Sequence, residues 1–251
     1  MQYNNIKVSV IMAIFNDHLN VSNSVRSILS QTYKNFELII IDDGSDKKTK
    51  KELMRFKKYK KVKIYNNKKN YGLSYSLNKA LNLSSSDIIF RMDSDDISHK
   101  DRLKLQLDFL NKNPKIDILG TNAKIVFDNV IKYSNLPLND FSIRKKLLFS
   151  NQFFHSSVVF KKKSIKQLGN YNKNFKRCQD YDLWLRARKE LRFANLKEKL
   201  ITYRSKENYQ ILTLLFTIKA LIKNILFTRE FIFAIISVLI HIVLYIKKNL
   251  A

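Results

Sequence analysis

The chain has 251 residues, 45% of them hydrophobic and 27% charged, which excludes an intrinsically disordered protein and permits one sizeable α/β domain with its own core. Lysine and arginine outnumber aspartate and glutamate by 47 to 21, so the formal net charge is +26. This excess favours anionic partners, namely nucleic acid, anionic lipid or phosphorylated substrates. The composition is also rich in Lys, Asn and Ile with only four glycines, as an AT-rich genome would produce, and this bias is an alternative origin of the charge.

Cysteine content and the first residues indicate where the chain works. Cys178 is the only cysteine, so no intrachain disulfide forms and a reducing compartment is expected. Its thiol is expected to be a small, partly buried side chain and not a nucleophile. The polar residues 1–7 precede a short apolar run that ends at Asn16-Asp17, which is not the pattern of a secretory signal peptide. We therefore expect the catalytic part to stay in the cytoplasm.

Predicted strands and helices alternate in the N-terminal part of the chain. Helical spacing or turn signals predict helices at 19–31, in the lysine-rich segment that ends near Lys58, and at 73–83. Short apolar runs predict buried strands at 8–15, 36–41, 62–65 and 87–90. The alternation predicts βαβ units and a mostly parallel central sheet flanked by helices. Ligands bind beyond the carboxyl ends of such strands, where polar or acidic residues follow three of these four runs.

The alternation loosens after Asp96. Amphipathic patterns predict helices at 102–110 and 179–190, and apolar runs predict strands at 116–127 and 155–160. The sequence has no internal repeat and no Pro/Gly/Ser-rich linker in this part. One catalytic domain is therefore predicted for residues 1–207.

The C-terminal tail, residues 208–251, differs in character. Its first apolar stretch, 211–227, carries two lysines at helical spacing, and its second, 231–246, is interrupted only by one serine and one histidine. The second stretch is shorter than the about 20 residues of an ordinary spanning helix, yet it has almost no polar face. We expect membrane-associated helices with their lysines at the lipid headgroups. A short spanning or re-entrant segment and packing against a partner subunit are left open.

Three carboxylates lie close together behind the fourth predicted strand. Asp93, Asp95 and Asp96 repel one another unless a cation compensates them, and their oxygen ligands suit Mg²⁺ or Mn²⁺. The alternatives are a solvated acidic loop or the N-cap of a helix. A second acidic turn, at Asp42-Asp43, follows another buried strand and favours a site at this edge of the sheet.

Three acidic residues, in two segments, have both an ordinary and a functional interpretation. Asp43 lies in a turn signal, and its carboxylate is also able to accept a ring N–H from a nucleobase. Asp180 and Asp182 open a predicted helix, where a carboxylate commonly complements the helix dipole. From the residues alone, a catalytic role of Asp180 is only one of these interpretations.

An ordered set of short motifs spans about residues 6–205. They are Val8-Ser-Val-Ile-Met-Ala-Ile-Phe-Asn16, Ser27-Ile-Leu-Ser-Gln-Thr-Tyr-Lys-Asn-Phe-Glu-Leu-Ile-Ile-Ile-Asp-Asp-Gly-Ser45, Asn70-Tyr-Gly-Leu73, Arg91-Met-Asp-Ser-Asp-Asp96, His155-Ser-Ser-Val158, Leu168-Gly-Asn-Tyr171 and Gln179-Asp-Tyr-Asp-Leu-Trp-Leu-Arg186. In order and spacing the chain resembles a family 2 glycosyltransferase of the GT-A fold, the type that builds bacterial surface polysaccharides and lipooligosaccharides. Three of the four glycines, Gly44, Gly72 and Gly169, fall inside these motifs, as expected where only glycine meets a backbone requirement.

The resemblance implies a role for five residues in donor binding. Ala13 and Phe15 line the nucleotide pocket, and Asp43 accepts a hydrogen bond from the base, usually uracil. Asp93 and Asp95 form the DxD motif, which holds the donor diphosphate through a divalent cation, Mn²⁺ or Mg²⁺. Asp95 is the expected direct metal ligand.

The resemblance also implies the catalytic base. Asp180 matches the acidic residue that takes this role, while the glutamate that usually precedes it is Gln179 here. The segment at Tyr203-Arg204 often carries a histidine two residues after the arginine, and that place is taken by Lys206. A lysine there is still able to meet a phosphate.

The expected reaction is inverting glycosyl transfer. Asp180 removes the proton of an acceptor hydroxyl as it attacks the anomeric carbon, and the nucleoside diphosphate, expected to be UDP, leaves with its charge compensated by the cation. The expected acceptor is a glycan or a lipid-linked glycan in cell-surface polysaccharide synthesis.

Two other functions compete with this one. The first is a non-catalytic basic protein that binds membrane or nucleic acid, and the second is a nucleotidyltransferase. The sequence contains no nucleic-acid-binding motif, and we do not expect nucleic acid as a partner. We expect peripheral or monotopic attachment to the cytoplasmic face of the bacterial inner membrane, with an oligomer formed through the tail as the open alternative.

Overall fold

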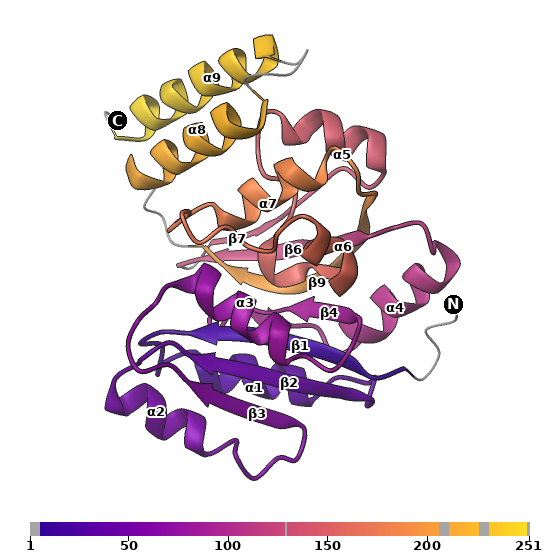
Figure 1. Cartoon of the computed structure of the whole chain (residues 1–251), viewed down its shortest axis with the longest axis vertical. Coiled ribbons are helices and arrows are strands. Elements are labelled where there is room, and N and C mark those ends of the chain that lie inside the picture. Colours follow the sequence, from indigo (N-terminus) through magenta and orange to yellow (C-terminus); the bar gives the residue numbers. More distant parts are fainter. Residues whose placement is uncertain (1–5, 129, 206–210, 226–230, 250–251) are drawn as a thin grey trace.

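The computed structural model describes residues 6–128, 130–205, 211–225 and 231–249. Within these ranges the strands form one nine-stranded sheet in the order β3-β2-β1-β4-β8-β6-β9-β5, with β7 paired to β6 (Figure 1). The strands are β1 (Val8–Ile14), β2 (Phe36–Asp42), β3 (Val62–Asn66), β4 (Ile88–Arg91), β5 (Ile97–Ser98), β6 (Ile118–Phe127), β7 (Val130–Tyr133), β8 (Val159–Lys161) and β9 (Phe193–Arg204). The helices are α1 (Val21–Leu29), α2 (Lys47–Met54), α3 (Leu73–Leu83), α4 (Arg102–Lys112), α5 (Asp140–Leu147), the 3₁₀-helix η1 (His155–Ser157), α6 (Lys162–Gln167), α7 (Gln179–Ala187), α8 (Ile211–Ile225) and α9 (Phe231–Asn249).

The N-terminal half of the sheet is parallel, as predicted. β1 pairs with β2 on one side and with β4 on the other, and β3 continues the sheet beyond β2. Every residue of β2 is buried, because Ile39 and Ile41 contribute to one apolar cluster and Leu38 and Ile40 to another. A continuous apolar run is what a parallel strand covered on both faces requires. The carboxyl ends of β1, β2 and β4 therefore meet at one edge, where the acidic residues follow.

The C-terminal half makes the sheet mixed, which corrects the prediction of a mostly parallel one. β8 lies between β4 and β6 and runs antiparallel to both, while β5 and β7 run antiparallel to β9 and β6. β9 runs parallel to β6. Parallel neighbours need a long crossover connection, usually a helix, and the sequence beyond β4 no longer alternates strands with helices.

Several elements of this half were not predicted. β9 was missed because the charged residues 197–199 interrupt its apolar pattern. The strand continues through these charged residues. Its pairing with β6 is irregular there, because Thr121, Asn122 and Ala123 pair with Leu196, Lys199 and Ile201. The short elements β5, β7, α5 and α6 were missed as well, and the predicted strand at 155–160 is divided into η1 and β8. A pattern of local hydrophobicity does not reveal elements this short.

The first helix of the tail belongs to the core of the catalytic unit. Leu221 of α8 is buried in the same cluster as Leu77 of α3 and Trp184 of α7, and Asn224 of α8 donates to Asp182 Oδ1 at 3.3 Å. Figure 1 shows α8 and α9 side by side at one end of the molecule, beyond α7. The predicted boundary between Glu207 and Asn208 lies outside the described residues. Among the helices of the described ranges, none combines the length and apolar character that crossing a bilayer requires.

Leu221 and Leu215 test this packing, because they lie on the same helix and are 0% and 54% exposed. We expect Leu221→Ala to lower the free energy of unfolding by about 2–5 kcal/mol, since it opens a cavity in the core. The control Leu215→Ala should change it by about 0.5 kcal/mol or less. Urea unfolding followed by the fluorescence of Trp184, the only tryptophan, measures both. Equally small effects would contradict a place for α8 in the core.

Candidate active site

An acidic cluster lies at the carboxyl end of β4. The carboxylate oxygens of Asp93, Asp95 and Asp96 lie within 4.8 Å of one another. Asp93 and Asp95 are half-buried, whereas Asp96 is buried. Closely spaced, partly accessible carboxylates are the ligands that Mg²⁺ and Mn²⁺ prefer. The donor set therefore fits the predicted divalent cation.

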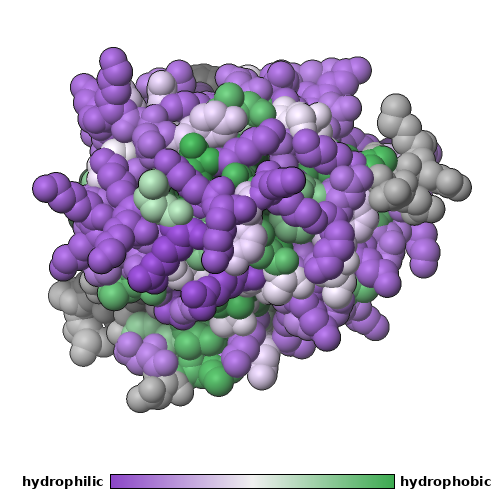
Figure 2. Space-filling view, turned by 90° about the horizontal axis from the view of Figure 1, so that it is seen from below, coloured by the Kyte–Doolittle hydropathy of each residue, from purple (hydrophilic) through white to green (hydrophobic). Residues whose placement is uncertain are grey.

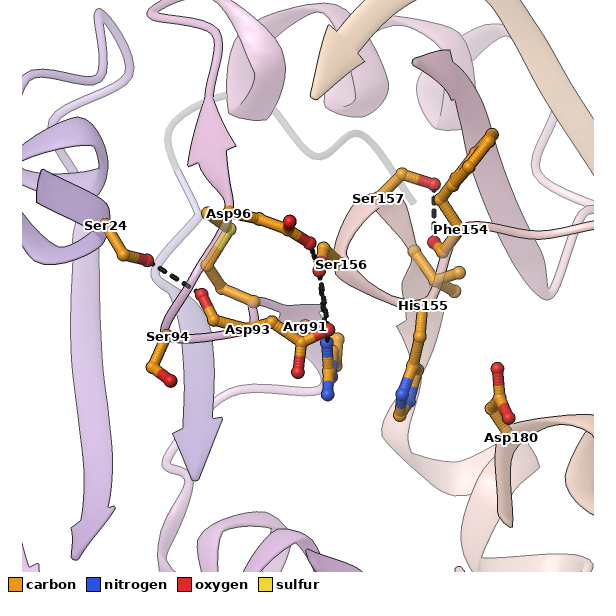
Figure 3. Close-up of polar contacts among 12 residues, drawn as sticks. Ser24, Arg91, Asp93, Ser94, Asp96, Phe154, His155, Ser156, Ser157 and Asp180 are labelled. Atoms are coloured by element: carbon orange, nitrogen blue, oxygen red, sulfur yellow. Dashed lines mark hydrogen bonds and ion pairs between the residues drawn. The ribbon is translucent and has the colours of Figure 1, made fainter. Parts of the chain in front are cut away.

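Arg91, the last residue of β4, is the internal counter-ion of this cluster. Its side chain is 1% exposed and forms an ion pair with Asp93. Arg91 Nη1 also donates to Ser156 Oγ at 3.2 Å, and Ser156 Oγ donates to Asp93 Oδ2 at 2.7 Å and contacts Asp96 (Figure 3). The Arg91 guanidinium of β4 and the Ser156 hydroxyl of η1 thus connect the carboxylates of Asp93 and Asp96, so the cluster keeps its shape before any metal binds.

Asp96 faces the protein and not the solvent. Its Oδ1 accepts the backbone N–H of Arg204 at 2.9 Å, which ties the end of β9 to the acidic turn. Burial raises the pKa of Asp96 to about 6, against the lowering effect of the hydrogen bonds from Ser156 and Arg204. Asp93 and Asp95 remain on the accessible side, which agrees with their assignment to the DxD motif.

Three of the four residues predicted to bind the nucleotide share one cavity. This cavity, with a volume of about 690 Å³, is lined by Ala13, Phe15 and Asp43. They meet because β1 and β2 are parallel neighbours and end side by side. Residues 70–75, which form the loop before α3 and the start of that helix, make a second wall, and the loop 173–177 makes a third. Asp93, also predicted to contact the nucleotide, lines an adjoining cavity instead.

Asp43 has a structural task that the sequence did not reveal. Its carboxylate accepts hydrogen bonds from Asn67 Nδ2 at 2.6 Å, from Tyr71 N at 3.0 Å and from Gly72 N at 2.8 Å. These contacts shape the loop that covers the cavity. A carboxylate has about four lone-pair sites, so capacity for one more hydrogen bond, from a base, remains.

Gly44 explains why this turn needs glycine. Its φ is +78°, a backbone conformation that side chains disfavour. A Cβ at this position would lie 2.5 Å from the carbonyl carbon of Lys69. The Asp42–Ser45 turn and the 70–75 loop therefore approach each other more closely than any other residue would permit.

Asp180 lies in the second cavity, which has a volume of about 380 Å³. This cavity also contains Asp93 and Arg91, and Leu73 lines both cavities. Burial raises the pKa of Asp180, while hydrogen bonds from the backbone of Tyr181 and from the Asn151 amide, 2.7 Å from Asp180 Oδ2, act in the opposite direction. A raised pKa makes this carboxylate a stronger proton acceptor than an ordinary aspartate.

The neighbouring titratable groups are poor candidates for the proton transfer. His155 lines the same cavity, but burial lowers its pKa well below the usual value, and its Nε2 is bonded to Tyr171 Oη at 2.9 Å. Burial raises the pKa of the Cys178 thiol to about 11, as expected for a thiol without a nucleophilic role. Asp182 is fully buried and pairs with Arg186 at 2.9 Å, so its role is structural. In Figure 3, Arg91 and Ser156 lie between the acidic cluster and Asp180.

Four site residues were missed from the sequence. Arg91 and Ser156 lie inside motifs that carried the resemblance, but nothing there indicated that they contact each other. Asn151 and Tyr203 also line the second cavity. Asn151 follows the unpredicted helix α5, and no signal pointed to it. Tyr203 lies in the unpredicted strand β9, and the resemblance matched its segment without giving Tyr203 a role. Lys206, the substitute for the expected histidine, lies outside the described residues.

Fold and site together define a class of protein. Two adjoining cavities and an acidic cluster lie beyond the carboxyl ends of parallel strands, as in α/β enzymes that bind a substrate of two parts. The model of Glycosyl transferase family 2 matches residues 9–169. The chain therefore belongs to glycosyltransferase family 2 and is a glycosyltransferase, which confirms the resemblance noted in the sequence.

Two curated relatives illustrate the family. The chain is 39% identical over 204 residues to the O-antigen biosynthesis glycosyltransferase WbnJ of Escherichia coli, covering 78% of this chain and 79% of WbnJ. It is 33% identical over 189 residues to the UDP-Gal:alpha-D-GlcNAc-diphosphoundecaprenol beta-1,3-galactosyltransferase of Escherichia coli, covering 72% of this chain and 67% of that enzyme.

A solved structure has the same architecture. The crystal structure of Staphylococcus aureus TarS 1–349 with UDP-GlcNAc superposes with a TM-score of 0.72 at 16% identity, covering 94% of this chain and 72% of that one. At this identity the likeness concerns the fold, which is of the GT-A type with a mixed sheet flanked by helices.

Asp95 tests the metal assignment. We expect Asp95→Asn to weaken Mn²⁺ binding by about tenfold or more, because removal of one carboxylate ligand removes both charge and an oxygen donor. Asp108→Asn, on the exposed face of α4, removes the same charge outside the cluster and serves as control. Electron paramagnetic resonance of free Mn²⁺ measures the affinity of each. Wild-type affinity in Asp95→Asn would place the metal elsewhere.

Proposed function

We propose that the protein transfers a sugar, with inversion, from a UDP-sugar to a hydroxyl of a glycan or lipid-linked acceptor in bacterial surface polysaccharide synthesis. The observation that carries this proposal is the arrangement of two cavities that share Leu73 in their walls. One has the Asp43 carboxylate in its wall and the other has Asp180, while Asp93 lines the second from the acidic cluster. A donor that lies across both cavities would have its base near Asp43 and its sugar near Asp180.

The residues have distinct tasks in this mechanism. Asp180 accepts the proton of the acceptor hydroxyl as that oxygen attacks the anomeric carbon from the side opposite the leaving group. The C–O bond to the nucleoside diphosphate breaks in the same step, and the configuration inverts. Asp93 and Asp95 would hold a divalent cation, which would supply charge compensation for the leaving diphosphate. Arg91 keeps Asp93 oriented for that task.

The relatives support the choice of substrates. One is named for O-antigen biosynthesis, and the name of another specifies UDP-Gal as donor and a diphosphoundecaprenol-linked sugar as acceptor. The TarS structure of similar fold was determined with UDP-GlcNAc. A non-catalytic nucleic-acid-binding protein and a nucleotidyltransferase, the alternatives left open by the sequence, are not supported by any of these comparisons.

Asp180→Asn tests the catalytic base. The substitution keeps the size of the side chain and removes its proton affinity, so kcat should fall by about 10²–10⁴-fold while UDP affinity stays unchanged. In the wild-type enzyme kcat should rise with pH through the Asp180 pKa, which burial raises above the ordinary aspartate value, and the variant should lack this limb. Radiolabelled transfer assays and calorimetric UDP titration measure the two quantities. Loss of UDP affinity with normal kcat would make Asp180 a binding residue.

The second part of the proposal is peripheral attachment to the cytoplasmic face of the inner membrane through the tail. α9 exposes a row of large apolar side chains: Ile232, Phe233, Ile235, Ile236, Leu239, Ile240, Val243, Leu244 and Ile246. A contiguous apolar surface of this kind marks a membrane or protein interface. The opposite end of the molecule, seen in Figure 2, is dominated by hydrophilic side chains with scattered apolar ones.

Charge and substrate favour lipid as the partner of this surface. The net charge of +26 suits anionic headgroups, since each cationic residue near such a surface contributes about 1 kcal/mol. A lipid-linked acceptor lies in the same membrane, so attachment would bring the site to its substrate. The competing explanation is contact between the tails of two copies.

Leu239→Glu combined with Val243→Glu tests the attachment. Both side chains are at least 50% exposed on α9, and charging them should reduce binding to phosphatidylglycerol vesicles by about tenfold or more, since burial of each apolar side chain is worth about 1.5–3 kcal/mol. Met54→Glu with Leu83→Glu adds the same charge on α2 and α3 and is the control. Vesicle sedimentation and light scattering measure binding and mass. Unchanged vesicle binding, or a dimer that becomes a monomer, would contradict the proposal.

A further inference from the structure

The third wall of the nucleotide cavity is strongly basic. The loop Asn172–Arg177, between α6 and α7, contributes Lys173, Lys176 and Arg177 to the lining. Among the described residues that line the cavity, Asp43 is the one carboxylate, and it already accepts three hydrogen bonds. The cavity is therefore a cationic compartment, which suits a multiply negative ligand.

Lys176 and Arg177 are not used elsewhere in the described part of the chain. Both side chains are exposed, and within the described residues no ion pair or side-chain hydrogen bond engages either of them. Lys173 is different, because its Nζ lies 5.3 Å from the ring centroid of Tyr75 in the same cavity. Two cations thus line a cavity without an ion pair or side-chain hydrogen bond to the residues that the structure describes.

The direction of the loop leads from the nucleotide cavity towards the catalytic base. After Arg177 and Cys178 the chain enters α7, whose first residues, Gln179 and Asp180, line the second cavity. In a nucleotide sugar the diphosphate lies between the base and the sugar. Arg177 therefore lines the first cavity close in sequence to the residues of the second, as a group that contacts a diphosphate between the two would have to do.

The core and the tail hold this loop in place. The Phe175 ring is 2% exposed and lies 5.9 Å from the ring of Phe216, and its carbonyl accepts Ser74 Oγ at 3.2 Å. Lys219 of α8 donates to the carbonyl of Asn174 at 3.4 Å, and its Nζ lies 5.2 Å from the Phe175 ring centroid. A loop anchored at its centre presents its cations with little further loss of entropy.

From these observations we infer that Lys176 and Arg177 bind the diphosphate of the donor and supply positive charge that does not depend on the metal. The inference rests on the proposed function for the identity of the donor. It assigns the loop to binding and leaves the proton transfer to Asp180. It also gives α8 a task as the element that positions this loop.

The test is the variant Lys176→Gln with Arg177→Gln, titrated calorimetrically in EDTA with UDP, uridine and inorganic diphosphate. We expect affinity for UDP and for diphosphate to fall by about tenfold or more, since hydrogen bonds to charged groups are lost, and affinity for uridine to stay unchanged. The control Lys163→Gln with Lys166→Gln removes the same charge from the exposed side of α6 and should behave as wild type.

The outcomes separate this inference from the proposed function. Wild-type affinity of the variant for UDP, an equal loss for UDP and uridine, or failure of the wild-type protein to bind diphosphate would each overturn the inference. If the wild-type protein binds diphosphate but not UDP, and the variant loses the diphosphate, the loop assignment stands and the choice of UDP as donor fails.

Discussion

The site depends on one buried cation. Three aspartates that follow β4 would repel one another in a partly dehydrated turn. The Arg91 guanidinium offsets this repulsion, because it forms an ion pair with Asp93 and donates a hydrogen bond to Ser156, which in turn donates to Asp93. The backbone of Arg91 is in turn held by Arg102, a fully buried residue of α4. Its Nη2 donates a hydrogen bond to the Arg91 carbonyl oxygen at 2.7 Å. A buried charge is tolerated only when it is paired and hydrogen-bonded. The acidic turn is therefore a preformed arrangement, and a metal would complete it without having to build it.

The mixed sheet brings the remaining parts of the site to this turn. The parallel strands β1, β2 and β4 deliver the acidic residues to one edge, because strands of the same direction end together. The antiparallel strand β8 returns the chain beside β4, so that η1 places Ser156 against the carboxylates. The tail then supports the other side, where α8 packs on α7 and on the basic loop that precedes it. A helix that the sequence analysis assigned to a membrane-associated tail thus packs as part of the catalytic unit.

Sequence reasoning identified the accessible groups of the site better than their supports. Asp43, Asp93, Asp95 and Asp180 follow buried strands or open a helix, so local pattern and resemblance pointed to them. The structure brings Asp43, Asp93 and Asp180 to two adjoining cavities and Asp95 to the acidic cluster with Asp93. The contacts that hold them, such as Ser156 on Asp93, join residues 63 positions apart. No local pattern encodes a contact at that separation.

The sequence by itself determined the strands and helices of the N-terminal half, because long apolar runs and helical spacing are local properties that packing on both faces of a sheet reinforces. It also determined, through its ordered motifs, the family. Only the tertiary structure decided that the sheet is mixed, that β9 continues through a charged segment, and that α8 enters the core. Those features depend on which strands pair and on which surfaces meet, and both are set by the free energy of burying the whole chain at once and not by any one segment.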